Sequence, residues 1–170
     1  ALNSIILHNN LTTILHYAFN GCSSLVTVNI PNSVTEMGEG IFAHCTKLQG
    51  FTGRYATNKG QLLIIGEALI AAAPQSVTEV TIPDNVTNIC ESAFTDCKKL
   101  KKVSMNNNVT RIGGGAFSGC TVLKSVQLSN NINKIEIITF SGCKALNSIT
   151  IPYSVKTIGG CAFSDCSALT

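Results

Sequence analysis

Apolar residues recur along this chain with a period of 23 positions. Each period opens with apolar residues at its first, fourth and sixth positions, as in Leu25, Val28 and Ile30. The fourth and sixth positions alternate with polar residues, which predicts a short β-strand with one buried face. A turn rich in Pro and Asn follows. Pro31 ends the strand in this period, because proline lacks an N–H group and has a fixed φ.

A second apolar pair follows the turn, as in Val109 and Ile112, and it predicts a second short strand. Gly and polar residues then lead into an Ala-Phe-x-x-Cys motif, as in Phe117 and Cys120. Two residues three positions apart share one side of a helical turn. We therefore expect a turn of 3₁₀ or α-helix at this place in each unit.

One such unit cannot bury its own apolar residues, so the units are expected to stack into a solenoid and to share one core. The third unit, residues 48–76, is six residues longer than the others. It carries two apolar segments around Gly66 and Glu67, which predict a β-hairpin. The whole chain, 1–170, is then one solenoid domain, and we expect it to be a fragment of a longer chain. Seven units begin at Leu2, Leu25, Leu48, Val77, Leu100, Leu123 and Leu146.

Composition narrows the classes of function. Charged residues make up only 12% of the chain and its net charge is +3, which is too weak to indicate a nucleic-acid partner. No signal peptide opens the sequence. The longest apolar run, residues 62–73, is interrupted by Gly66 and Glu67 and is too short to span a bilayer. We therefore predict no membrane insertion by this segment.

The repeat resembles the BspA-type leucine-rich repeat. The pattern Leu-x-x-Val-x-Ile-Pro-x-x-Val-Thr-x-Ile-Gly-x-x-Ala-Phe-x-x-Cys-x-x-Leu is matched almost throughout by residues 25–48 and 146–169. The resemblance implies an α/β repeat fold dominated by β-structure: a right-handed solenoid with short parallel strands and helical turns. It also implies a secreted or surface-anchored protein of a host-associated bacterium, with adhesion to host proteins or other cells as its usual role.

No catalytic, metal or cofactor site is indicated. Six of the eight cysteines share one repeat position, which indicates a ladder of buried free thiols; pairing of neighbouring rungs into disulfides is the alternative. The chain has no Cys-x-x-Cys motif, and its three histidines occupy three different repeat positions. We therefore predict that the protein is not an enzyme and binds no cofactor.

Two groups of residues are candidates for contact with a partner. Lysines cluster beside the strand face over three units, where a protein or an acidic glycan could dock; the alternative is a solvated edge that prevents strand aggregation. The second group lies in the long unit, because insertions in repeat proteins often lie on a binding face. These residues predict a surface binding module, with a structural spacer as the alternative. The candidates are Lys98, Lys101, Lys102, Lys124 and Lys144 in the first group, and Arg54 and Tyr55 in the second.

Overall fold

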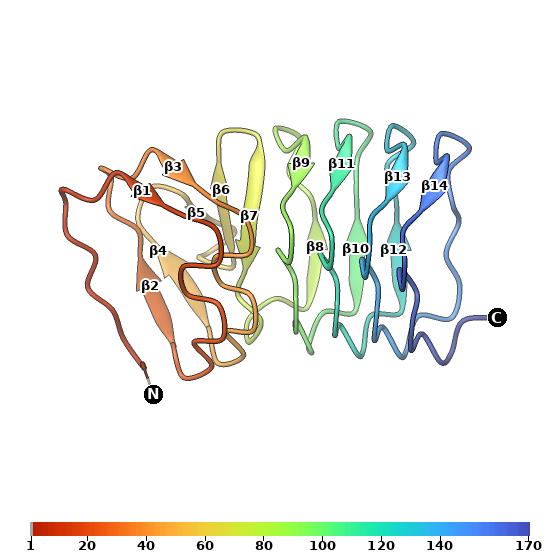
Figure 1. Cartoon of the computed structure of the whole chain (residues 1–170), viewed down its shortest axis with the longest axis horizontal. Coiled ribbons are helices and arrows are strands. Elements are labelled where there is room, and N and C mark those ends of the chain that lie inside the picture. Colours follow the sequence, from red (N-terminus) through yellow and green to blue (C-terminus); the bar gives the residue numbers. More distant parts are fainter. Residues whose placement is uncertain (1) are drawn as a thin grey trace.

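Two columns of short strands run along the long axis of the molecule (Figure 1). The computed structural model describes residues 2–170. Where the strands of regular units pair within a column, they lie parallel and in register at a spacing of 23 residues, as in the pair Lys102 and Ser125. The chain is therefore a β-solenoid, as the repeat pattern predicts. The right-handed winding implied by the family resemblance stays a prediction.

The first column is formed by the strand at the start of each unit. Its members are β2 (Thr27–Asn29), β4 (Gly50–Thr52), β8 (Glu79–Thr81), β10 (Lys102–Ser104) and β12 (Ser125–Gln127). The central residue of each strand is buried, for example Val103 at 0% exposure, whereas its neighbours Lys102 and Ser104 point outward. The alternation of apolar and polar residues thus produces one buried face, as the sequence predicts.

The second column contains the two-residue strands that follow the polar turn. They are β1 (Thr13–Ile14), β3 (Glu36–Met37), β9 (Asn88–Ile89), β11 (Arg111–Ile112), β13 (Lys134–Ile135) and β14 (Thr157–Ile158). The isoleucines of β9, β11 and β13 are at most 1% exposed. The two columns therefore enclose a narrow apolar core between them.

The long unit replaces its second strand with a larger element. It contains β5 (Ala56–Thr57), β6 (Leu62–Ile65) and β7 (Ala68–Ala72). Strands β6 and β7 form an antiparallel hairpin, and β7 pairs in parallel with β9. The buried residues divide into two clusters, one mostly N-terminal and one mostly C-terminal to the hairpin, and each cluster includes side chains from β6 and β7. The hairpin thus extends the second column from β9, while β1 and β3 form a separate pair on the N-terminal side.

The helical turns predicted at the Phe-x-x-Cys motif are not formed, and residues 2–170 contain no helix. The amides of Ala93, Thr95 and Cys97 donate to carbonyls three residues back, but the amides between them donate to the next unit, as Phe94 does to Ala116 at 2.7 Å. In addition, Asp96 has a φ of 58°, which interrupts any helix. The prediction is wrong because neighbouring units compete for half of the amides.

The phenylalanines of the motif form ladders inside the core. The rings of Phe94, Phe117 and Phe140 are nearly parallel, with centroids 5.0 and 5.4 Å apart. Phe140 stacks in turn on Phe163 at 5.5 Å. The long unit has no Phe-x-x-Cys turn, so this ladder begins at Phe94. A separate group of rings lies on the N-terminal side, formed by Phe19, Phe42 and Phe51.

Candidate functional site

The candidate lysines lie together on the outer surface of neighbouring units. Lys101 and Lys124 occupy the same position in successive units, and the Lys124 amide donates to the Lys101 carbonyl at 2.9 Å. Lys102 points outward from β10. Lys144 follows the next Cys turn along the chain and is exposed. The stacking of units therefore brings Lys101, Lys102 and Lys124 onto adjacent rungs, as their repeat positions indicate.

Their charges are neutralised to different degrees. Lys98 Nζ lies 3.8 Å from the Asp96 carboxylate, so part of its charge is balanced. Within residues 2–170, the other four candidate lysines form no ion pair. Lys102 faces the exposed Glu79 across the strand pair, beyond ion-pair distance. We define the lysine stripe as the four unpaired residues Lys101, Lys102, Lys124 and Lys144.

The two candidates of the long unit have different environments. Tyr55 is only 8% exposed, and its hydroxyl donates to the Val34 carbonyl at 2.6 Å. The Arg54 guanidinium lies 4.5 Å above the Tyr55 ring and also donates to its hydroxyl. Tyr55 is therefore a core residue that anchors the long unit and offers almost no surface to a partner. Arg54 is exposed, although its head group is held in place.

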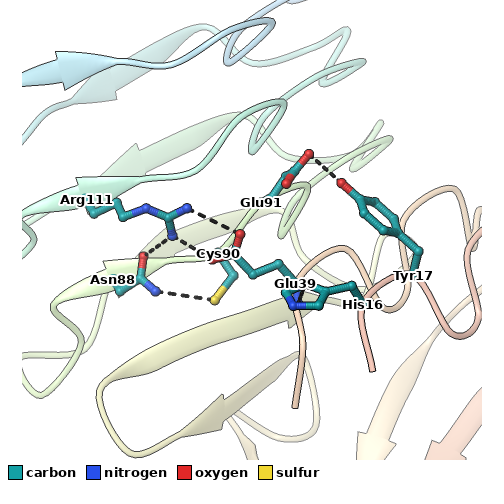
Figure 2. A network of polar contacts seen from close by, with 7 residues as sticks. All are labelled: His16, Tyr17, Glu39, Asn88, Cys90, Glu91 and Arg111. Atoms are coloured by element: carbon teal, nitrogen blue, oxygen red, sulfur yellow. Dashed lines mark hydrogen bonds and ion pairs between the residues drawn. The ribbon is translucent and has the colours of Figure 1, made fainter. Parts of the chain in front are cut away.

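A polar network that the sequence analysis did not predict connects the two sides of the long unit (Figure 2). The Arg111 guanidinium donates to both carboxylate oxygens of Glu39, at 2.6 and 3.3 Å, and to the Asn88 side chain at 2.9 Å. The Tyr17 hydroxyl donates to the Glu91 carboxylate at 2.5 Å. These pairs are 72 and 74 residues apart in the chain. We call this set of contacts the polar clasp.

A third side-chain contact crosses the same junction. His44 Nδ1 lies 2.8 Å from Asp96 Oδ2, and the Gly40 amide donates to the Glu91 carbonyl at 3.1 Å. The junction exists because the long unit lacks the Phe-x-x-Cys turn, so the turns of the units before and after it meet directly. The missing motif could have indicated this from the sequence.

The pKa values of the polar clasp, and of Cys90 beside Asn88, fit a structural role. The hydrogen bond to Glu91, burial and nearby negative charge together raise the pKa of Tyr17 to about 12. The hydrogen bond to Glu39 raises the pKa of Arg111. Burial, followed by the charge of Glu39, raises the pKa of Cys90 to about 11. Tyr17 and Cys90 therefore stay protonated near neutral pH, and neither is activated as a nucleophile or base.

The cysteine ladder is also structural, and all eight cysteines are free. Burial raises the pKa of Cys45 and of Cys143 to about 12. Thiols of four ladder residues donate to the carbonyl of the phenylalanine one unit earlier, at 3.1–3.2 Å: Cys45, Cys120, Cys143 and Cys166. The thiols of the other two ladder residues, Cys22 and Cys97, make no hydrogen bond within residues 2–170.

Metal and membrane sites are not found in the described part of the chain. Between residues 2 and 170, no group of three His, Cys, Asp or Glu side chains is arranged to hold a metal ion. The same residues include no helix that could cross a membrane. The surface features that remain as candidates are the lysine stripe and the openings between strands.

Comparison with known proteins identifies the repeat. The BspA type leucine rich repeat region matches residues 1–59 and 64–170 in six copies. Among solved structures, the chain is similar to a leucine rich cell surface protein of Faecalibacterium prausnitzii, with 31% identity and a TM-score of 0.89. That alignment covers 95% of this chain and 45% of the other. A comparison with curated protein sequences gives no match.

Two further solved structures share the fold. A leucine-rich repeat protein of Bacteroides ovatus is 27% identical, with a TM-score of 0.66 over 94% of this chain and 40% of that protein. The pneumococcal vaccine antigen PcpA is 23% identical, with a TM-score of 0.82 over 95% of this chain and 42% of the antigen, and this similarity concerns the fold alone. The chain thus spans less than half the length of these relatives. Proteins with this repeat are generally non-catalytic. Because the repeat pattern covers nearly the whole sequence, the chain belongs to the BspA-type leucine-rich-repeat family.

Proposed function

We propose that this chain is a non-catalytic binding module of a cell-surface protein, and that an acidic protein or glycan docks on the lysine stripe. The observation that carries the proposal is the stacking of Lys101 and Lys124 on adjacent rungs beside Lys102, with no carboxylate near enough to form an ion pair. Unpaired ammonium groups clustered on neighbouring units create a positive potential that attracts acidic partners. Lys98 contributes less, because Asp96 balances part of its charge.

The relatives support the location. The similar protein of Faecalibacterium prausnitzii is a cell surface protein, and the chain shares 31% identity with it over nearly its whole length. The family resemblance favours a secreted or surface-anchored protein of a host-associated bacterium, with adhesion to host proteins or cells as its role. A purely structural spacer is the second candidate. It is favoured by the remainder of the strand face, which is mostly uncharged and has few large side chains that could anchor a partner.

The lysine stripe is tested by charge reversal. Lys101, Lys102 and Lys124 are all replaced by Glu, and binding to heparin and to an immobilised polyglutamate peptide is measured over a range of salt concentrations. We expect the parent to bind at least one probe, more weakly as salt rises, because salt screens exposed charges. We expect the triple variant to lose that binding by about tenfold or more. Its melting temperature should fall only slightly, because the three side chains are exposed, although Lys102→Glu sets a carboxylate opposite that of Glu79.

A matched control separates local position from net charge. Replacing the exposed Lys47, Lys59 and Lys156 by Glu gives the same change of charge in other parts of the molecule and should leave binding nearly unchanged. Equal loss in both triple variants would mean that overall charge, rather than the lysine stripe, drives binding. Loss in Arg54→Ala with normal binding in the triple variant would favour the long unit. If neither probe nor any host matrix protein binds the parent, the spacer is the better description.

A further inference from the structure

Strand pairing in the first column stops after β12. Residues 148–150 occupy the repeat position of the next strand, yet they form no strand in the structure. A cleft of about 350 Å³ opens between the two units instead. This volume is within the usual range of small-ligand sites. The residues that line the cleft are Val126, Gln127, Leu128, Asn130, Thr150 and Pro152.

The opening removes a backbone bond that earlier units make. The Met105 amide donates to the Gln127 carbonyl at 3.0 Å, and the same bond joins the unit before. The equivalent bond, from Leu128 to Thr150, is not formed within residues 2–170. Backbone and side-chain polar groups of this unit are therefore open to a ligand on the side where a further strand would pair.

The side-chain ladder along the turns stops at the same place. Asn107 Oδ1 accepts a hydrogen bond from the Asn130 amide at 3.0 Å, which ties the two turns together. The corresponding bond from Tyr153 to the Asn130 side chain is not formed in the described chain. The side chains of Gln127, Asn130 and Thr150 make no hydrogen bond within residues 2–170. Two amides and one hydroxyl thus line the cleft with their donors and acceptors unused.

Apolar surface adjoins these polar groups. Val126 and Leu128 are 9% and 7% exposed, and they contribute the base of the cleft. Pro152 lies on its wall, and the next residue, Tyr153, is fully exposed. None of the lining residues carries a charge. A fully charged ligand would therefore lose hydration in the cleft without gaining an ionic partner.

We propose that this cleft binds a neutral sugar ring, at the end or within the chain of a glycan. Every sugar hydroxyl both donates and accepts, and so do side-chain amides and hydroxyls such as those of Gln127, Asn130 and Thr150. The C–H face of the ring can pack on the apolar side chains of Val126, Leu128 and Pro152. A peptide added as a further strand fits less well, because the open edge is only three residues long and Thr150 and Pro152 line the opposite side of the cleft.

The test is a titration of the full chain with neutral hexoses, N-acetylhexosamines and short uncharged oligosaccharides, followed by NMR at high ionic strength. At least one sugar should shift the signals of Gln127 and Asn130. Gln127→Ala and Asn130→Ala should each weaken the binding of that sugar by about tenfold, because each removes a hydrogen-bonding group that lines the cleft. Both side chains are exposed, so folding is preserved.

Control variants occupy the same repeat positions where the strands pair normally. Thr81→Ala in β8 corresponds to Gln127, and Asn32→Ala corresponds to Asn130; both should bind the sugar as the parent does. The triple Glu variant of the lysine stripe should also bind normally, so this test succeeds or fails independently of the proposed function. Loss of sugar binding in that variant, or with rising salt, would assign the ligand to the lysines and overturn the neutral site.

Two other results would overturn the proposal. One is that no sugar shifts any signal of the cleft; if an extended peptide does so instead, the opening is a strand-addition site. The other is slow hydrogen exchange at the Leu128 amide in the free protein. That result would show that residues 148–150 pair with β12 in solution and that the cleft is closed.

Discussion

The phenylalanine ladder allows the stacking of rings to be separated from their burial. Phe94 and Phe117 are both 0% exposed, but Phe94 stacks on one ring and Phe117 on two. Their planes differ from those of their neighbours by 14° or less at centroid distances of 5.0–5.4 Å, which is an offset stack. Replacing each by Ala removes the same apolar volume and a different number of ring contacts.

The expected costs follow from these environments. Truncating a buried Phe costs about 3–5 kcal/mol, and each favourable ring pair adds about 0.5–1.5 kcal/mol. Phe117→Ala should therefore destabilise the protein by about 1 kcal/mol more than Phe94→Ala. Phe163, half-buried with a single ring neighbour at 5.5 Å, should cost less than either. For a chain of this length each 1 kcal/mol lowers the melting temperature by about 2–4 °C.

The assay is urea unfolding followed by circular dichroism, because the chain contains no Trp to report by fluorescence. The slope of the transition must be checked in every variant, since repeat arrays can unfold in steps. Phe117→Leu is the control, because it keeps apolar volume and removes the ring pairs, and it should cost about half as much as Phe117→Ala or less. Equal losses of unfolding free energy in Phe94→Ala and Phe117→Ala would refute the stacking contribution. If Phe163→Ala lowered the free energy of unfolding as much as Phe117→Ala, the ladder itself would be refuted.

Three further predictions concern polar and thiol groups. Thiol titration should find eight reactive cysteines in denatured protein and, in native protein, rapid reaction only at the exposed Cys161 and slower reaction at the half-buried Cys22; several disulfides in unreduced protein would contradict this. The pKa of Tyr17 is raised from 10.0 to about 12, so its stabilising effect is complete below pH 10 and is lost as the pH rises to 12. Urea midpoints at increasing pH should therefore fall more in the parent than in Tyr17→Phe over this window, and parallel curves would disprove the effect. A double-mutant cycle on Arg111 and Glu39 should give a coupling free energy of about 0.5–1 kcal/mol, because the pair is partly exposed, and a value near zero would show that this contact does not stabilise the fold.

Much of the fold could be read from the period of the sequence. In a stack of identical units, each residue meets its own counterpart 23 positions away, so a one-dimensional pattern predicts strand register directly. The pairing of Lys102 with Ser125 and the buried position of Val103 follow from that rule. It also predicts which lysines become neighbours, because Lys101 and Lys124 share a repeat position.

Some features depend on which of two possible partners a group bonds to, and only the tertiary structure shows which partner it is. The turn at Phe94 is not helical because half of its amides bond to the neighbouring unit, and local spacing carries no information about that neighbour. Tyr55 lies in an irregular, largely polar segment, yet its ring fills the core and its hydroxyl reaches Val34. The sequence pattern also could not show that residues 148–150 form no strand, because this unit matches the repeat almost throughout.

The junction across the long unit shows the difference most directly. Arg111 and Glu39 are 72 residues apart, which is not a multiple of the repeat, so periodicity offers no reason to pair them. They meet because the hairpin fills one strand position while the unit contributes no Phe-x-x-Cys turn, and the turns on either side close the gap. The sequence determined the structure of the regular units, because equivalent residues in a stack of similar units have equivalent neighbours. Tertiary structure decided what happens where the repeat is interrupted, since there the neighbours are set by how the interruption packs.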